Sequence, residues 1–549
     1  MPEKKKDGFI MQAGILAAAS IICRIIGLLY KSPLTAIIGD EGNGYYTTAY
    51  NIYTIILLVS SYSIPSAISK VLAQRIALKE YRNAQKMFRC AIVYVMVIGG
   101  AASLILFFGA PFLVMGNSIP VLRIFAPTIF FYGLLGVLRG YFQAHRTMLQ
   151  TSISQILEQI LNAVVSMGAA YLLIQLVAEQ DQSTQAMYGA IGSALGTGSG
   201  VVVALLFMWV IYLMNRKTVK RRIDHDRTEN AESYKEIFKV IMMVVTPFIL
   251  STCIYNLTTS LDQSIYLKVM TLGKKMSEVE VTTNYGIFAG KAVVISNIPI
   301  ALSSAMSSAI MPSIAAAYAQ GAWKQAKKKV SSAIKVTMLI SIPAAVGIGV
   351  LAKPVVSLLF PQKSSLEMAS RLLMGLAVTV IFYALSTLTN AVLQGIGKVN
   401  TPVINAAVSL VIQTAVLVPV LWFTELGLFA VVIATVIYSL LMCILNARSL
   451  KKHMDYKQEM DKTFFRPLFS AVLMGTAAWG TYIGADSLLH MIMRSEYFIN
   501  MISLLVSVFV GALLYFALVI KLKAVKETEL KALPKGRLFV KLAKKMHLL

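Results

Sequence analysis

Long apolar runs recur along the whole chain and are separated by short polar or charged stretches. A helix needs roughly 20 apolar residues to cross the hydrocarbon of a bilayer. No stretch between the runs is long enough to form a separate soluble domain. The pattern therefore predicts an all-α polytopic membrane protein with about 14 transmembrane helices. The predicted spans are 9–30, 45–69, 87–112, 119–140, 149–177, 186–213, 238–263, 284–310, 331–352, 369–394, 402–423, 427–447, 466–485 and 498–520.

Lys and Arg are concentrated in alternate loops between these spans. Of 549 residues, 57% are hydrophobic and 14% are charged, and the formal net charge is +26. Such a charge would suit a nucleic-acid-binding protein, but cytoplasmic loops of membrane proteins hold the same excess. With the N-terminus inside, most basic residues fall on the cytoplasmic side. We therefore expect a cell-membrane protein with both termini in the cytoplasm and no nucleic-acid partner.

The two halves of the chain resemble each other. The sequence Ser-Ala-Ile at 66–68 recurs at 308–310, and Tyr81-Arg82 aligns with Trp323-Lys324 at the same offset of 242 residues. Six spans separate the copies, so both halves have the same orientation. Transporters with such parallel repeats place their substrate path between the halves. The expected parts are an N-terminal six-helix lobe (1–214), a cytoplasmic linker (215–237), a C-terminal six-helix lobe (238–447), an appended helix pair (448–520) and a basic cytoplasmic tail (521–549).

Three basic residues are predicted to lie inside spans or at their ends, where charge is costly. Arg24 lies well inside the first span, and Lys31 follows on the same helical face. Lys291 lies in the middle of the eighth span. A buried charge costs about 2.5–3.5 kcal/mol and usually faces a bundle interior or a wet cavity. These residues either form a cationic cavity for an anionic ligand, such as a phosphate, or are held by neighbouring carbonyls and ion pairs.

Acidic and amide side chains also fall inside spans. Glu158 shares a helical face with Gln155, Gln159, Asn162 and Ser166, which we call the polar seam. Such residues often hold helices together, and burial would also let a lone Glu carry a proton. Asp262 ends a polar run that begins at Asn256. The run either lines a cation or substrate site or lies at the outer interface.

Enzyme chemistry finds little support in the sequence. The five histidines fall in predicted loops or the tail, without metal-ligand spacing, and the four cysteines have unrelated spacings. No phosphate-cradling glycine loop is present. We therefore expect no catalytic residues, no metal and no cofactor. Transport would then be coupled to Na⁺, H⁺ or the membrane potential.

Three motifs near the N-terminus resemble the opening of the multidrug/oligosaccharidyl-lipid/polysaccharide exporter superfamily. They are Arg-Ile-Ile-Gly-Leu-Leu-Tyr at 24–30, Gly-Asp-Glu-Gly-Asn-Gly-Tyr-Tyr at 39–46 and Ile-Pro-Ser-Ala-Ile-Ser-Lys at 64–70. The chain is most similar to Gram-positive MurJ-like lipid II flippases and sporulation-type polysaccharide exporters. The resemblance covers essentially the whole chain, as six plus six plus two helices.

The resemblance implies a two-lobed flippase that moves an undecaprenyl-pyrophosphate-linked peptidoglycan precursor outward by alternating access. Arg24, Lys31 and Lys291 match basic positions that would receive the pyrophosphate. Apolar Leu57 and Leu58 stand where some lipid II flippases carry a basic residue, so another lipid-linked glycan is an alternative. A cation-coupled multidrug exporter is a further alternative. The implied partners are a lipid-linked glycan and cell-wall synthesis proteins, and the expected state is a monomer.

Overall fold

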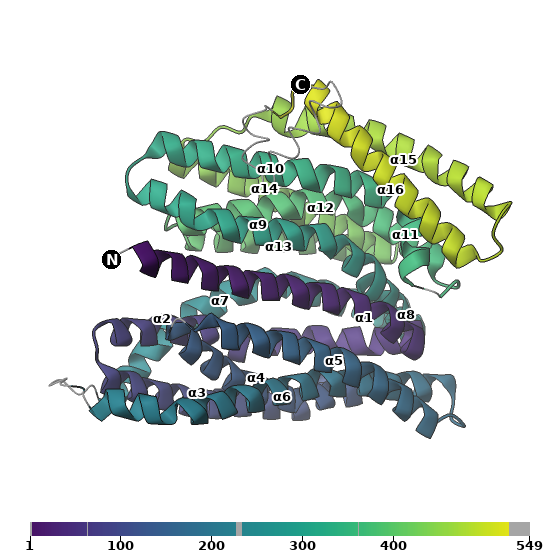
Figure 1. Ribbon diagram of the computed structural model, residues 1–549. Helices are drawn as coiled ribbons and strands as arrows, with labels where there is room; N and C mark the ends of the chain where they lie inside the picture. The colour runs from purple at the N-terminus through teal and green to yellow at the C-terminus, as the bar shows by residue number, and fades with distance from the viewer. Residues whose placement is uncertain are drawn as a thin grey trace. The chain divides into compact units, whose positions relative to one another are not determined.

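The apolar segments are helices in the computed structural model (Figure 1). The structure describes residues 3–62, 64–145, 147–224, 226, 233–360 and 362–525; for some residues within the helices it describes the backbone and not the side chain. This described part contains helices and no strands, so the all-α prediction is confirmed. Twelve of its helices are long and apolar enough to cross a membrane. One such stretch, Ile22–Ser61, includes Gly39, whose φ of 71° and ψ of 179° interrupt the helix. The predicted number of 14 spans stays a prediction.

The chain divides into two compact units, Met1–Gly286 (unit 1) and Ile287–Leu549 (unit 2). Unit 1 contains α1 (Glu3–Leu57), η1 (Leu58–Tyr62), α2 (Ile64–Ala77), α3 (Tyr81–Leu113), α4 (Ser118–Ala144), α5 (Met148–Leu176), α6 (Gln182–Asp224), α7 (Tyr234–Lys268), η2 (Val269–Gly273) and α8 (Glu278–Ile287), which ends one residue past the boundary. Unit 2 contains η3 (Phe288–Ala292), α9 (Val293–Ala319), α10 (Trp323–Val350), α11 (Ala352–Leu359), α12 (Leu366–Gly395), α13 (Asn400–Phe423), α14 (Leu428–Met454), η4 (Asp461–Phe465), α15 (Arg466–His490) and α16 (Glu496–Lys521). The segments labelled η are π-helical.

These units differ from the predicted lobes in where the first one ends. The predicted linker 215–237 is helical at both ends, because α6 continues to Asp224 and α7 begins at Tyr234. Ser233 and Glu236 form a capping box that fixes the start of α7. Helix α7 then packs on α1, α2 and α3, so it belongs to unit 1. Of the predicted tail, residues 526–549 lie outside the described residues.

Two of the hydrophobic clusters among the described residues of unit 1 are large. One surrounds Phe88 and Met208, where α2, α3, α4, α6 and α7 meet. The second surrounds Phe125, where α1, α3, α4 and α6 meet, and a smaller cluster joins Leu34 and Ile38 of α1 to Ala170 of α5. In unit 2, α12 packs on α9, α10 and α14, and the pair α15 and α16 runs side by side against α10 and α11 (Figure 1). Each bundle buries aliphatic and aromatic side chains inside and leaves apolar residues on its surface, as a bilayer requires.

The sequence repeat at the offset of 242 residues corresponds to a repeated turn. Lys79 and Gly321 are both left-handed, with φ of 64° and 71°. The following residues, Glu80 and Ala322, have nearly equal backbone angles (φ −80° and −81°, ψ 66° and 61°). A new helix begins one residue later in each half. The α2–α3 turn of unit 1 and the α9–α10 turn of unit 2 therefore share one backbone geometry.

Candidate functional site

Arg24 and Lys31 lie on the first half of α1, before the break at Gly39. The Arg24 side chain is exposed, and no carboxylate of the described residues forms an ion pair with it. The Lys31 ammonium lies over the ring of Tyr46, 4.4 Å from its centroid. A cation over an aromatic face gains about 0.5–2 kcal/mol, more where water is excluded. The first half of α1 thus carries an exposed guanidinium and, seven residues later, an ammonium that lies over an aromatic ring.

Lys291 lies in unit 2, within the π-helical segment η3. Its side chain is fully buried, and its ammonium donates a hydrogen bond to the hydroxyl of Ser365 over 2.6 Å. The same ammonium is 5.7 Å from the ring centroid of Phe360. Single π-helical turns often mark functional positions. Because Lys291 and Arg24 belong to different units, a cavity shared by both stays a prediction.

Glu158 is the acidic member of an ion pair that its sequence pattern does not predict. The guanidinium of Arg139 on α4 lies 2.7 Å from the Glu158 carboxylate on α5, and it also donates to Ser154 over 2.9 Å. The side chains of Arg139 and Glu158 are 6% and 23% exposed. Glu158 is therefore not the lone carboxylate that was considered as a proton carrier. The two residues lie on consecutive helices joined by a short loop, which was the signal available in the sequence.

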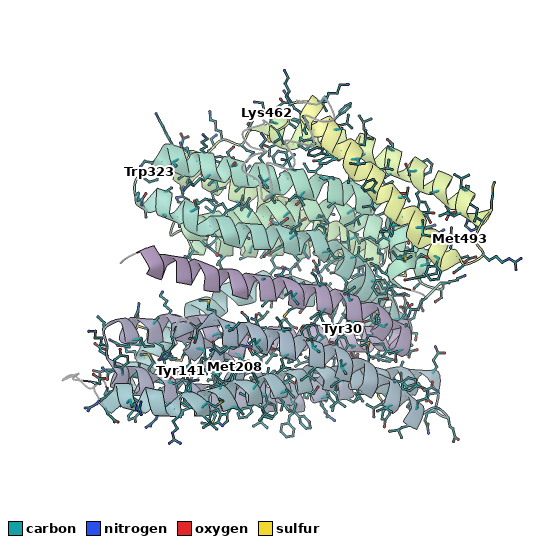
Figure 2. The ribbon with its side chains drawn as sticks, in the orientation of Figure 1. Tyr30, Tyr141, Met208, Trp323, Lys462 and Met493 are labelled. Atoms are coloured by element: carbon teal, nitrogen blue, oxygen red, sulfur yellow. The ribbon has the colours of Figure 1, made fainter. Side chains whose placement is uncertain are left out.

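The polar seam continues from Glu158 along α5. Asn162 donates to the hydroxyl of Tyr30 on α1 over 3.4 Å (Tyr30 is labelled in Figure 2). The carbonyl oxygen of the Asn162 side chain accepts from Ser166 at 3.0 Å and from Thr197 of α6 at 3.3 Å. These bonds connect α1, α5 and α6. They support the predicted role of the seam in holding helices together.

Asp262 is buried within unit 1, and its neighbour Gln263 connects α7 to α1. The Gln263 side chain accepts from Asn51 at 2.5 Å and donates to the carbonyl oxygen of Thr48 at 3.0 Å. Asn51 also donates to the hydroxyl of Tyr285 on α8 over 3.3 Å. Asn51 was not singled out in the sequence, although it interrupts an apolar run. The side chain of Asn256, the other predicted residue of this helix, lies outside the described residues.

The Gly-Asn-Gly motif at 42–44 allows the second half of α1 to approach two other helices. A Cβ atom on Gly44 would lie 2.4 Å from the carbonyl oxygen of Thr282 on α8. A Cβ atom on Gly42 would lie 2.9 Å from the carbonyl oxygen of Ala186 on α6. Asn43, between them, donates to the carbonyl oxygen of Gly286 over 3.0 Å. The motif therefore serves close packing of backbones within unit 1.

Comparison with known proteins identifies relatives over most of the chain. A family model described as lipid II flippase MurJ matches residues 83–492. The lipid II flippase MurJ of Bacillus subtilis (strain 168) is 22% identical over 476 residues, covering 84% of this chain and 86% of that protein. Stage V sporulation protein B of the same organism is 24% identical over 460 residues, covering 81% and 84%.

Solved structures share the fold. A lipid II flippase MurJ in an inward closed conformation has a TM-score of 0.67 and 14% sequence identity, covering 92% of this chain and 97% of that one. An inward-facing multidrug transporter of the MATE family has a TM-score of 0.59 and 18% identity, covering 81% and 98%. At these identities the likeness concerns the fold. The resemblance of the N-terminal motifs to the exporter superfamily is confirmed.

Proposed function

The chain belongs to the lipid II flippase MurJ family of multi-pass membrane transporters, and on that premise we propose that it moves a lipid-linked glycan across the cytoplasmic membrane. Lipid II, the undecaprenyl-pyrophosphate-linked peptidoglycan precursor, is the substrate we favour. Alternating access would expose the substrate site first to the inner side and then to the outer side. The hydrophobic polyprenyl tail would stay in contact with apolar helix surfaces.

The observation that carries the proposal is the exposed Arg24. A guanidinium within a membrane-spanning helix is costly unless a ligand, water or counter-charge meets it, and the described residues supply no carboxylate for it. A pyrophosphate offers charge-assisted, bidentate hydrogen bonds of the geometry that guanidinium prefers. In this account Arg24 and Lys31 attract the pyrophosphate, and Lys291 contributes positive charge from unit 2.

Growth rescue tests this proposal. In a bacterium whose own lipid II flippase is depleted, expression of the wild-type chain should restore growth, and Arg24→Ala should not. Arg123→Ala is the matched control, because Arg123 is also an exposed arginine of unit 1 and lies over the ring of Phe107. Wild-type failure despite membrane expression would favour another lipid-linked glycan, as expected of a relative of the sporulation proteins. Rescue by Arg24→Ala would remove Arg24 from the mechanism.

The multidrug-exporter alternative shares the fold but predicts a different charge. An exporter of cationic drugs should present acidic rather than basic side chains in its substrate path. The acidic residue of the polar seam, Glu158, is neutralised by Arg139. We therefore expect cells expressing the chain to show unchanged sensitivity to ethidium and other cationic dyes. Increased dye resistance would favour the exporter.

Orientation and coupling follow from the same proposal. Both termini would lie in the cytoplasm, because basic residues cluster in the loops on that side. Labelling of single cysteines introduced at the chain ends with a membrane-impermeant maleimide tests this, and labelling in intact cells would contradict it.

Transport would draw on Na⁺, H⁺ or the membrane potential. Ionophores that each dissipate one of these gradients would identify the gradient whose loss stops growth rescue.

A further inference from the structure

Four aromatic rings form one cluster between the second half of α1 and α4. Tyr46 and Tyr50 are stacked, with centroids 5.6 Å apart and an interplanar angle of 13°. Tyr53 and Phe125 are also stacked, at 4.7 Å and 21°. Tyr50 contacts both members of this second pair at 5.8 Å. Each ring therefore has two or more aromatic neighbours, which fix its orientation.

Tyr50 is the exposed member of this cluster. Its side chain is 39% exposed, whereas Tyr46, Tyr53 and Phe125 are at most 4% exposed. Most exposed side chains facing out of α3 and α5, such as Phe108 and Leu172, carry no polar atom and suit contact with lipid tails. A tyrosine presents a flat apolar face together with a hydroxyl, and this combination suits a ligand with both apolar and polar parts.

The exposed ring of Tyr50 and the ammonium of Lys31, one of the residues predicted to bind pyrophosphate, both contact the ring of Tyr46. The Lys31 ammonium is 4.4 Å from the Tyr46 centroid, and Tyr46 stacks on Tyr50 at 5.6 Å. The ammonium therefore lies at most 10.0 Å from the Tyr50 centroid. In a polyprenyl-pyrophosphate-linked glycan the first sugar is bonded directly to the pyrophosphate. A pyrophosphate held by Lys31 would place that sugar within reach of Tyr50.

We propose that Tyr50 is a stacking platform for the first saccharide ring of the lipid-linked glycan. The C–H groups on one face of a pyranose carry partial positive charge, and the face of an aromatic ring is negative, so the two attract. Such a platform recognises a sugar ring without reading its individual hydroxyl groups. This inference rests on the proposed function and adds to it a saccharide subsite on unit 1.

Binding of two lipids by the purified full-length protein tests the platform. The probes are lipid II, which carries a disaccharide-pentapeptide, and undecaprenyl pyrophosphate, which carries no sugar. Wild-type protein should bind lipid II more tightly than the sugarless lipid. Tyr50→Ala should weaken lipid II binding by about three- to tenfold, the range of one aromatic contact. Its affinity for undecaprenyl pyrophosphate should be unchanged.

Three further proteins make the result specific. Tyr50→Phe keeps the ring and should bind lipid II like the wild type. Tyr171→Ala removes another exposed tyrosine, on α5, and should also leave binding unchanged. Arg24→Ala should weaken both lipids equally, since it acts on the pyrophosphate. Thermal unfolding of each variant shows whether the fold is intact.

Each remaining outcome is informative. Equal weakening of both lipids by Tyr50→Ala would overturn the platform, because the residue would then act on the pyrophosphate or on the fold. Unchanged binding of both lipids would also overturn it and would place Tyr50 against bilayer lipid. Failure of the wild type to bind either lipid would instead contradict the proposed function itself.

Discussion

Removing one member of the Arg139–Glu158 pair should expose the structural role of the polar seam. The Arg139 side chain is 6% exposed and bound to Ser154 as well as Glu158, so Glu158→Gln leaves a buried guanidinium without its counter-charge. Breaking a buried pair costs about 3–5 kcal/mol. Because Glu158 is 23% exposed, we expect the lower end of this range, about 3 kcal/mol.

Thermal unfolding in detergent measures the effect. A loss of about 1 kcal/mol lowers the Tm of a domain of some 200 residues by about 2–4 °C, so a loss of about 3 kcal/mol in Glu158→Gln should lower the Tm by roughly 6–12 °C. Arg139→Gln should cost less, since the carboxylate left without its partner is 23% exposed, whereas the guanidinium left by Glu158→Gln is 6% exposed. The double variant Arg139→Gln/Glu158→Gln should have a higher Tm than Glu158→Gln, because it leaves no unpaired charge.

The opposite pattern would refute this reasoning. If Glu158 carried a proton during transport, Glu158→Gln would abolish growth rescue while the Tm stayed at the wild-type value. A double variant no more stable than Glu158→Gln would also contradict the pair as a mutual charge compensation. Loss of rescue at an unchanged Tm would favour the proton-carrying role of Glu158 that the sequence left open.

Three further predictions concern the backbone and the α1–α7–α8 contacts. Gly44→Ala should lower the Tm and abolish rescue, because its Cβ would meet the carbonyl oxygen of Thr282 at 2.4 Å; a Tm equal to the wild type would show that α8 shifts freely. Lys79→Gly should raise the stability of the α2–α3 turn by up to about 1 kcal/mol, since the equivalent turn already has Gly321 at this left-handed position; an unchanged or lower Tm would contradict this. Asn51→Ala should lower the Tm, because Gln263 and Tyr285 would each lose a hydrogen bond from the Asn51 amide. Asn51→Asp should also have a Tm below the wild type, because a carboxylate cannot donate a hydrogen bond to the Gln263 side-chain oxygen.

Apolar patterning in the sequence predicted the helices well but underestimated their lengths. The predicted span 186–213 is part of α6, which extends from Gln182 to Asp224. Hydropathy detects the part of a helix that lies in hydrocarbon, whereas the helix continues into polar surroundings wherever its backbone hydrogen bonds continue. Helix α11, of eight residues, was missed because it is too short to span a bilayer.

Pairing between helices could not be predicted to the same degree. The sequence indicates that the charge of Glu158 is costly inside a span, but it does not identify Arg139 as its partner. It likewise does not indicate that Asn51 pairs with Gln263. A helix that is apolar all round has no hydrophobic stripe to fix its rotation, so the sequence does not say which polar side chains meet. The roles of Arg24, Lys31 and Lys291 in substrate binding stay predictions.

Translocation by the purified protein in liposomes tests the central claim most directly. Lipid II would be reconstituted with the chain, and its appearance in the outer leaflet would be followed by an enzyme that acts only outside. The wild type and Arg123→Ala should move lipid II, and Arg24→Ala should slow its movement to the rate of empty liposomes. Movement by Arg24→Ala at the wild-type rate would contradict the account of a cationic site that receives the pyrophosphate.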